Sequence, residues 1–239
     1  MNQARGLHRA RYVRAMFGRI ARRYDLMNTL MTAGLDARWR AAAVVAARPA
    51  PDGMALDVGT GTGRLALALA VSMPTGRVIG VDFAEPMLRH GAETMARERS
   101  GGRVRFVLAD ALALPFRDES FDCVTTAFTV RNVPDLEAAL REMVRVVRPG
   151  GRIACLEITR PRSVVAPLFR LYFRKLVPIL GRFISGDPEA YAYLPDSAYA
   201  FLDARSLAGA MRLAGLAGVR YRYLSMRSVA LHVGARPPK

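Results

Sequence analysis

The feature that most constrains the fold is a glycine-rich segment that follows the short apolar run at residues 54–58. Glycines at positions 59, 61 and 63 alternate with threonines, and residues 64–72 after them have helical composition. A buried strand, a turn without Cβ atoms and a helix N-terminus together predict a nucleotide-binding site. Asp82 ends the next apolar run, where a carboxylate can bind a ribose.

The spacing of the glycines indicates which nucleotide binds. A dinucleotide fingerprint reads GxGxxG, whereas this chain reads GxGxG and has no glycine at the later position, which disfavours an NAD-dependent dehydrogenase. Asp57 lies just before the turn, where a carboxylate would repel a pyrophosphate but suits an amino group and a sulfonium cation. A third acidic position, Asp110, follows the next apolar run. Together these features favour a binding site for S-adenosylmethionine. The alternative is a tight turn in another α/β protein.

The size and composition predict one globular domain. With 239 residues, of which 51% are hydrophobic, the chain can bury a sizeable core. No apolar run reaches the length of a membrane span, and the N-terminus lacks the apolar core of a signal peptide. Cys123 and Cys155 fall in predicted buried strands, which indicates core residues in a reducing compartment. We expect no metal site, because no His/Cys/Asp cluster has ligand spacing.

The formal net charge of +16 is carried almost entirely by arginine. Arginines are interleaved with large apolar groups at residues 1–23 and 158–186, and neither segment contains an acid. This pattern favours an anionic membrane surface or an amphiphilic ligand at least as well as nucleic acid, and a solvated basic face equally well. We expect a cytoplasmic protein with peripheral contact at the inner face of the membrane, and the sequence leaves a homodimer open.

Strands and helices alternate along the chain. We expect strands at residues 54–58, 77–81, 104–108, 121–127, 152–158, 219–224 and 229–233. We expect helices from residue 12, at about 36–48, and at 64–72, 85–99, 134–147, 163–183 and 204–214. The last two strands have a short connection and should pair antiparallel. This order predicts an α/β fold: a Rossmann-like, mostly parallel seven-stranded sheet with helices on both faces, as in class I S-adenosylmethionine-dependent methyltransferases.

Within this single domain of residues 1–239 we expect four parts. A helical cap (1–50) precedes the cofactor-binding core (51–160). A substrate-side insertion (161–202) and a C-terminal helix with a strand pair (203–239) follow.

Four short segments carry a family resemblance. They read YDLMN at 24–28, FTVRNV at 128–133, RPGGR at 148–152 and VALH at 229–232. With them the sequence resembles the ubiquinone/menaquinone biosynthesis C-methyltransferases over nearly the whole chain. Because the first segment falls inside the resemblance, we expect the basic N-terminus to be mature protein. The chain departs from the family at Arg64, where an acid is common, and at Ala127, where a small hydroxyl residue is common.

The resemblance and the residue chemistry together define the expected cofactor site. Asp57 should attract the amino group, Asp82 the ribose hydroxyls, and Asp110 the adenine amino group, although a turn role for Asp110 is the alternative. Tyr24 should close over the cofactor. The predicted cofactor-binding residues are Tyr24, Asp57, Gly59, Gly61, Thr62, Gly63, Asp82, Phe83, Asp110, Ala111 and Ala127.

The resemblance also implies the acceptor, a prenylated quinol whose ring carbon becomes nucleophilic when a neighbouring hydroxyl ionises. We expect Arg131 to stabilise that phenolate and Asn132 to orient the ring. The alternative for Arg131 is a surface salt bridge. The predicted substrate-binding residues are Phe128, Arg131, Tyr191 and Tyr193, and the tyrosines could equally belong to the core. His232 reads as a satisfied structural histidine.

Three rival functions stay open at this point. A methyltransferase of another small molecule, such as a lipid amine or a specialised metabolite, shares the same cofactor half. A nucleic-acid methyltransferase is disfavoured, because FTVRNV stands where amino-directed enzymes carry an Asn/Asp-Pro-Pro-aromatic segment. The intact glycine turn and three acids argue against a non-catalytic protein.

Overall fold

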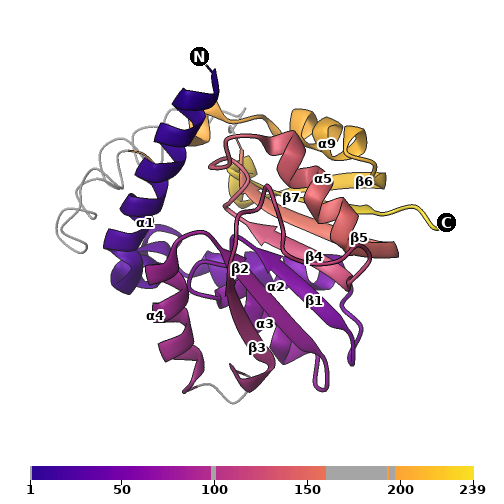
Figure 1. Cartoon of the computed structure of the whole chain (residues 1–239), viewed down its shortest axis with the longest axis horizontal. Helices are drawn as coiled ribbons and strands as arrows, with labels where there is room; N and C mark the ends of the chain where they lie inside the picture. Colours follow the sequence, from indigo (N-terminus) through magenta and orange to yellow (C-terminus); the bar gives the residue numbers. More distant parts are fainter. Residues whose placement is uncertain (1, 98–100, 160–192, 194–196) are drawn as a thin grey trace.

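The fold is organised around one seven-stranded sheet (Figure 1). The computed structural model describes residues 2–97, 101–159, 193 and 197–239. The strand order is β3-β2-β1-β4-β5-β7-β6, and β7 runs antiparallel to both of its neighbours. The strands are β1 (Met54–Val58), β2 (Arg77–Asp82), β3 (Val104–Leu108), β4 (Phe121–Ala127), β5 (Val147–Ile158), β6 (Ala217–Leu224) and β7 (Val229–Ala235). The predicted architecture is therefore confirmed, including the antiparallel terminal pair.

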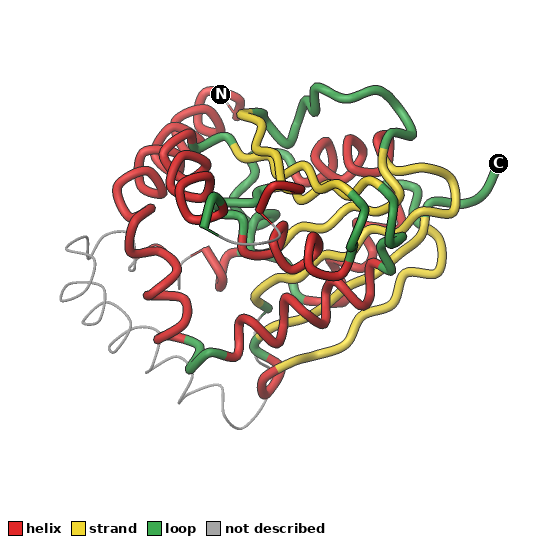
Figure 2. Tube along the Cα trace, turned by 90° about the horizontal axis from the view of Figure 1, so that it is seen from below, coloured by secondary structure: helices red, strands yellow, loops and turns green. Residues whose placement is uncertain are grey.

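Helices cover both faces of the sheet (Figure 2). They are α1 (Asn2–Met31), α2 (Leu35–Ala47), α3 (Arg64–Ser72), α4 (Glu85–Met95), α5 (Leu136–Val146) and α9 (Ala204–Leu213). Short 3₁₀ turns lie at Gly101–Arg103 and Ser225–Arg227. The predicted helix at 163–183 lies outside the described residues.

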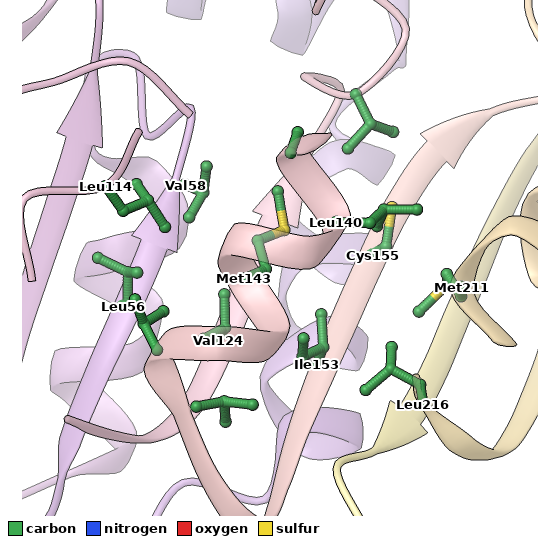
Figure 3. Packing of buried hydrophobic residues seen from close by; sticks show 14 of the residues in the cluster. Leu56, Val58, Leu114, Val124, Leu140, Met143, Ile153, Cys155, Met211 and Leu216 are labelled. Atoms are coloured by element: carbon green, nitrogen blue, oxygen red, sulfur yellow. The ribbon is translucent and has the colours of Figure 1, made fainter. Parts of the chain in front are cut away.

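Alternation along each strand divides the core into two layers, because successive side chains point to opposite faces. On one face α5 and α9 pack over the sheet, and Figure 3 shows Leu140 and Met143 of α5 beside Val124, Ile153 and Cys155 of the strands. On the other face α2 and α3 pack over the intervening strand residues, such as Ala55 and Leu156. Both cysteines are buried in strands, as expected.

Several boundaries differ from the sequence prediction: α1 already begins at Asn2, α4 ends at Met95, and the region of α5 and β5 differs as follows. The helix expected at 134–147 begins at Leu136, because the Asp135 carboxylate caps it by accepting from the Ala138 N–H (2.9 Å). Its far end is already strand, since β5 starts at Val147, opposite Phe121 of β4, with a register shift before Cys123. The glycine pair after Pro149 was expected between a helix and the next strand. It lies within an irregular part of β5 instead.

The N-terminal helices pack against the cofactor half of the sheet. Helix α1 contacts the start of α4, where Phe17, Ala21 and Tyr24 meet Ala84 and Met87 (Figure 1). Helix α2 packs on α3 and on β5, where it contacts the sheet face that carries Ala154 and Leu156. Of the helices in the described ranges, none combines the length and hydropathy needed to cross a bilayer.

Candidate functional site

A cavity opens at the carboxyl ends of the parallel strands, next to the end of β1. In the sheet β1 lies between β2 on one side and β4 on the other. Ligands of open α/β sheets bind at this topological position. Its non-atom space is ≈ 510 Å³, including space open to solvent. The lining residues follow β1, β2, β3 and β4: Val58, Gly59, Val81, Asp82, Phe83, Ala109, Asp110, Ala111, Thr129, Asn132, Val133 and Pro134.

The glycine turn at the end of β1 is required by both conformation and space. Gly59 and Gly63 have φ of 66° and 84°, in the left-handed region that side chains disfavour. A Cβ on Gly59 would lie 2.1 Å from Thr129 Cγ2, and one on Gly63 would lie 2.6 Å from Phe106 Cζ. The Thr129 hydroxyl donates to the Gly59 carbonyl (3.1 Å), so the segment after β4 is fastened to the turn.

Asp82 lies at the end of β2 and lines the cavity. One carboxylate oxygen accepts from the Gly61 N–H (2.8 Å) and the other from the Ala84 N–H (2.9 Å). Burial raises the pKa of Asp82, and these backbone hydrogen bonds oppose that rise. The carboxylate thus orients the glycine turn, and each of its oxygens keeps a second lone pair for a ligand.

Asp57 lies behind the turn and is not among the cavity-lining residues. It is buried, and its Oδ1 accepts from the Thr125 hydroxyl (2.8 Å). Burial raises the pKa of Asp57 to about 6, against the lowering effects of the Thr60 and Thr125 hydroxyls and the Arg40 charge. Its Oδ2 has no donor in hydrogen-bonding geometry among the described residues, which is unusual for a buried polar atom.

The segment after β3 supplies the far side of the cavity. Asp110 and Ala111 line it, and so does Phe83 after β2. The Asp110 carboxylate also accepts from the Leu112 N–H (2.9 Å), so the turn role named as the alternative is present as well. Ala127 does not line the cavity; its carbonyl accepts from the Thr129 hydroxyl (3.1 Å).

Sequence reasoning missed the partner of Thr62. The Thr62 hydroxyl donates to Asp25 of α1 (2.8 Å), although Thr62 was expected to contact the cofactor. Gly61 and Gly63 flank it and, like Thr62, do not line the cavity. Tyr24, next to Asp25, packs edge-on against Phe17 (centroids 5.8 Å apart) beside α4, and it does not line the cavity either. An acid inside the YDLMN segment was the available signal for the contact.

Asp36 is a second missed residue, and it explains the Arg64 departure. Asp36 is 1% exposed at the start of α2, and its Oδ2 accepts from Arg64 Nη1 (2.8 Å). Arg64 also donates to Thr29 of α1 (3.1 Å), and Arg40 lies 3.6 Å from the same carboxylate. Because Arg64 is the first residue of α3, this ion pair ties the helix that follows the glycine turn to both N-terminal helices.

Arg131 forms a buried ion pair, where the alternative interpretation expected a surface one. Its Nη1 donates to Glu157 Oε1 (2.7 Å) and to the Phe128 carbonyl (2.6 Å), and both charged side chains are at most 5% exposed. Arg131 does not line the cavity. Glu157 was not predicted, although a carboxylate inside the apolar run of β5 signals a paired buried charge.

Of the residues predicted for the acceptor, Asn132 and its contact Tyr193 lie at the cavity. Asn132 lines the cavity, and its Oδ1 accepts from the Tyr193 hydroxyl (3.1 Å). The Tyr193 ring lies 6.0 Å from that of Tyr12 on α1. Phe128 has a φ of 59°, and its ring faces Trp39 (6.3 Å) and Arg40 (5.6 Å) of α2 rather than the cavity. Tyr191 lies outside the described residues.

His232 was predicted to be a satisfied structural histidine; it is buried, but its Nδ1 has no hydrogen-bond partner among the described residues. Its Nε2 lies 2.9 Å from the Ala204 carbonyl. Burial lowers its pKa. Among the described residues, no group of three or more His, Cys, Asp or Glu is placed to hold a metal ion.

The donor and acceptor groups of the cavity fit S-adenosylmethionine. Asp82 offers carboxylate oxygens at the end of β2, which suits ribose hydroxyls, and Asp110 offers another at the far side. The buried, unsatisfied Oδ2 of Asp57 suits a cationic or amino group near the glycine turn. Among the described residues that line the cavity none is cationic, in agreement with a positively charged ligand.

This sheet order with this cavity defines the class I S-adenosylmethionine-dependent methyltransferase fold. The chain is similar to a methyltransferase structure from Thermotoga maritima described as a possible histamine N-methyltransferase, with a TM-score of 0.65, 21% identity and coverage of 94% of this chain and 99% of that one. It is also similar to the [4+2]-cyclase SpnF, with a TM-score of 0.67, 18% identity and coverage of 85% and 82%. These likenesses show the fold alone.

The chain belongs to the ubiE/COQ5 methyltransferase family, whose model matches residues 5–236. It is 51% identical to the demethylmenaquinone methyltransferase of Roseiflexus castenholzii, covering 95% of this chain and 94% of the relative. It is 46% identical to that of Thermus thermophilus (93% and 100%) and 40% identical to the ubiquinone/menaquinone biosynthesis C-methyltransferase UbiE of Desulfotalea psychrophila (94% and 90%). The protein is therefore an S-adenosylmethionine-dependent methyltransferase, and the predicted family and cofactor are confirmed.

Proposed function

We propose that this methyltransferase acts on a ring carbon of demethylmenaquinol and produces menaquinol. The observation that carries the proposal is the 51% identity, over 95% of the chain, to a relative named demethylmenaquinone methyltransferase. The contact between Asn132 and Tyr193 supports it, because an acceptor ring beside the cavity would need a polar group and an aromatic group, and Asn132 lines the cavity with Tyr193 bonded to it.

In this proposal Asp82 binds the ribose, Asp110 and Ala111 frame the adenine, and the glycine turn packs against the methionine portion. When bound, S-adenosylmethionine supplies an activated methyl group on a sulfonium, so the protein needs no nucleophile of its own. The chain's contribution is alignment: the hydrogen bonds of Asp82 to the N–H groups of Gly61 and Ala84 fix the cofactor side before the acceptor arrives.

The acceptor side activates the quinol by favouring its ionised form. Glu157 and the Phe128 carbonyl hold the Arg131 guanidinium in one position, next to Asn132 in the chain. A fixed cation in a site shielded from water lowers the free energy of a phenolate more than a mobile surface arginine does. Asn132, itself held by Tyr193, orients the ring so that the reacting carbon faces the methyl group.

The experiment is a competition for label. The purified protein is incubated with methyl-labelled S-adenosylmethionine and, separately, reduced demethylmenaquinol, reduced demethylated benzoquinols, phospholipid vesicles and RNA. We expect label in the naphthoquinol. Label only in lipid or RNA would contradict the quinol assignment. Asn132→Ala should lower turnover while calorimetry finds unchanged cofactor affinity; loss of both together would contradict its role on the acceptor side.

We further infer that α1 approaches the membrane that holds the prenylated acceptor. Leu26 and Leu30 lie one turn apart on α1 and are 53% and 48% exposed, and Arg22, one turn before Leu26, is exposed as well. An apolar strip with basic neighbours suits an anionic lipid surface. Replacing both leucines with serine should lower co-sedimentation with anionic vesicles and leave cofactor affinity unchanged, whereas unaltered sedimentation would contradict this contact.

A further inference from the structure

Two arginines share one face of the sheet near the ends of β5 and β6. Arg152 of β5 pairs with Ala235 of β7, and Arg220 of β6 pairs with Val233. Paired residues point to the same face, and so do residues two apart on one strand. Arg152 and Arg220 therefore flank Val233 and Ala235, on the face that is covered by α2 further along the strands.

A third arginine joins them from helix α2. Arg48 directly follows the last residue of α2, whose side chains pack on β5 over the same face. Loss of solvent lowers the pKa of Arg152, and the positive charges of Arg48 and Arg220 lower it further. The half-buried Arg152 guanidinium thus lies within electrostatic reach of Arg48 and Arg220, both of which are exposed.

Several arginines elsewhere in the fold are paired with carboxylates. Arg64 meets Asp36, Arg145 meets Glu142 and Asp118, and Arg148 meets Asp122. Within the described part of the chain, Arg48, Arg152 and Arg220 have neither a carboxylate within 4.0 Å nor a side-chain hydrogen bond. Three like charges on one face, one of them half-buried, repel one another, and an anion between them would relieve that repulsion.

We propose that Arg48, Arg152 and Arg220 form a binding site for a phosphate-type oxyanion, either free or on a lipid headgroup. Guanidinium groups are planar donors that match two phosphate oxygens each, so three of them on one face can share one phosphate-type anion. The site lies at the amino ends of the parallel strands, at the C-terminal end of β7 (Figure 1). The methyl-transfer cavity is at the opposite, carboxyl ends, so the two sites are separate.

The test uses the full chain and inorganic pyrophosphate as the probe, by calorimetry at low ionic strength. We expect one equivalent to bind, and the Arg152→Gln/Arg220→Gln variant to bind at least about tenfold more weakly. The matched control is Arg77→Gln/Arg105→Gln, which removes the same charge from exposed positions on β2 and β3 at the other edge of the sheet. Equal losses in both variants would reduce the site to general charge attraction and overturn the proposal.

Thermal unfolding gives an independent readout. If the anion relieves the repulsion among the three arginines, pyrophosphate should raise the Tm of the wild-type protein. Arg220→Gln should raise the Tm without pyrophosphate, and adding pyrophosphate to this variant should raise it no further. Vesicles with phosphatidic acid separate the two sources: cluster-dependent vesicle binding without pyrophosphate binding assigns a lipid headgroup. If neither probe binds through these arginines, the proposal is wrong. Methyl transfer should be the same in the cluster variant and the control.

Discussion

The two sides of the active site are built in different ways. The cofactor side is made of backbone: the turn at Gly59 and Gly63 and the N–H groups that Asp82 accepts from. The proposed acceptor side is made of side chains that reach across the fold, since Arg131 meets Glu157 of β5 and Asn132 meets Tyr193. The first is fixed by local chain conformation, and the second exists only when distant segments are packed.

This difference indicates how each side should respond to mutation. A backbone-built site fails when a side chain is added where none fits, and the damage should appear in cofactor affinity. A site of buried polar pairs fails when one member is removed, and the damage should appear in stability and turnover. An acceptor-side variant that also lowered cofactor affinity would break this separation.

Gly59→Ala should have the largest effect. Its Cβ would lie 2.1 Å from Thr129 Cγ2, in a residue with a φ of 66°, so the turn and the segment after β4 must both move. We expect cofactor affinity to fall at least about 100-fold. Gly150→Ala is the control, because Gly150 has a similar φ of 81° but a Cβ added there would meet no atom within 4 Å.

The readout for this pair is calorimetry with S-adenosylmethionine, together with the free energy of unfolding from denaturation in urea. Gly150→Ala should cost about 1–2 kcal/mol of stability and leave cofactor affinity intact. If Gly59→Ala bound the cofactor normally, the turn would not be the cofactor side.

Glu157→Gln should come next, acting on the acceptor side. It leaves the Arg131 guanidinium buried without its counter-charge, which should cost about 3 kcal/mol of unfolding free energy. Glu137→Gln is the control: it removes an exposed glutamate from a similar pair with Arg141 and should cost about 0.5 kcal/mol or less. Below the unfolding transition, Glu157→Gln should lower kcat and leave the Kd for S-adenosylmethionine unchanged. A shift in that Kd would contradict the separation.

The cofactor side could be predicted from the sequence because its parts are contiguous. The glycine spacing and the alternating apolar runs fix the turn, and Asp82, Asp110 and Ala111 follow from where β2 and β3 end. The same reasoning placed the seven strands along the chain and the antiparallel pairing of the last two. The prediction was wrong at the start of β5, where Val147 already pairs with Phe121. The cause is a register shift between β4 and β5, which leaves no pattern in the sequence of either strand by itself.

The acceptor side could not be predicted in the same way. Sequence reasoning named Arg131 and Asn132 but not Glu157, which is 26 residues away and forms a pair only through the contact between β4 and β5. Likewise Asp36 and Arg64 are 28 residues apart, and their ion pair depends on how α2 packs on α3. Polar partners of this kind are set by tertiary packing, so only the presence of a charge in an apolar run could hint at them.

Asp57 links stability and cofactor binding through pH. Its pKa is raised to about 6 in the folded protein, so between about pH 4 and 6 the unfolded chain loses the proton before the folded one does. Stability therefore falls across this range, by about 3 kcal/mol in all, and stays lower above it. Asp57→Asn should flatten this dependence and raise stability at pH 7.5, as measured by urea denaturation from pH 4 to 8.

The same variant should weaken S-adenosylmethionine binding about tenfold at pH 7.5, because the carboxylate that attracts the cationic ligand is gone. Wild-type affinity should fall toward the variant's value as the pH drops below about 6. Asp52→Asn, at an exposed position before β1, is the control and should do neither. A parallel fall of wild type and variant with pH would show that another group titrates.

Tyr193→Phe should have the smallest effect, and it tests the acceptor side most gently. The substitution removes only the hydroxyl that donates to Asn132 Oδ1 (3.1 Å) and keeps the ring beside Tyr12. One neutral hydrogen bond contributes about 1 kcal/mol, so kcat should fall about fivefold while the Kd for S-adenosylmethionine stays constant. Tyr12→Phe is the control, because its hydroxyl has no hydrogen bond to the described residues and its ring contact with Tyr193 persists. If Tyr193→Phe changed only KM for the quinol, the hydroxyl would bind the acceptor without orienting Asn132 for the transfer step.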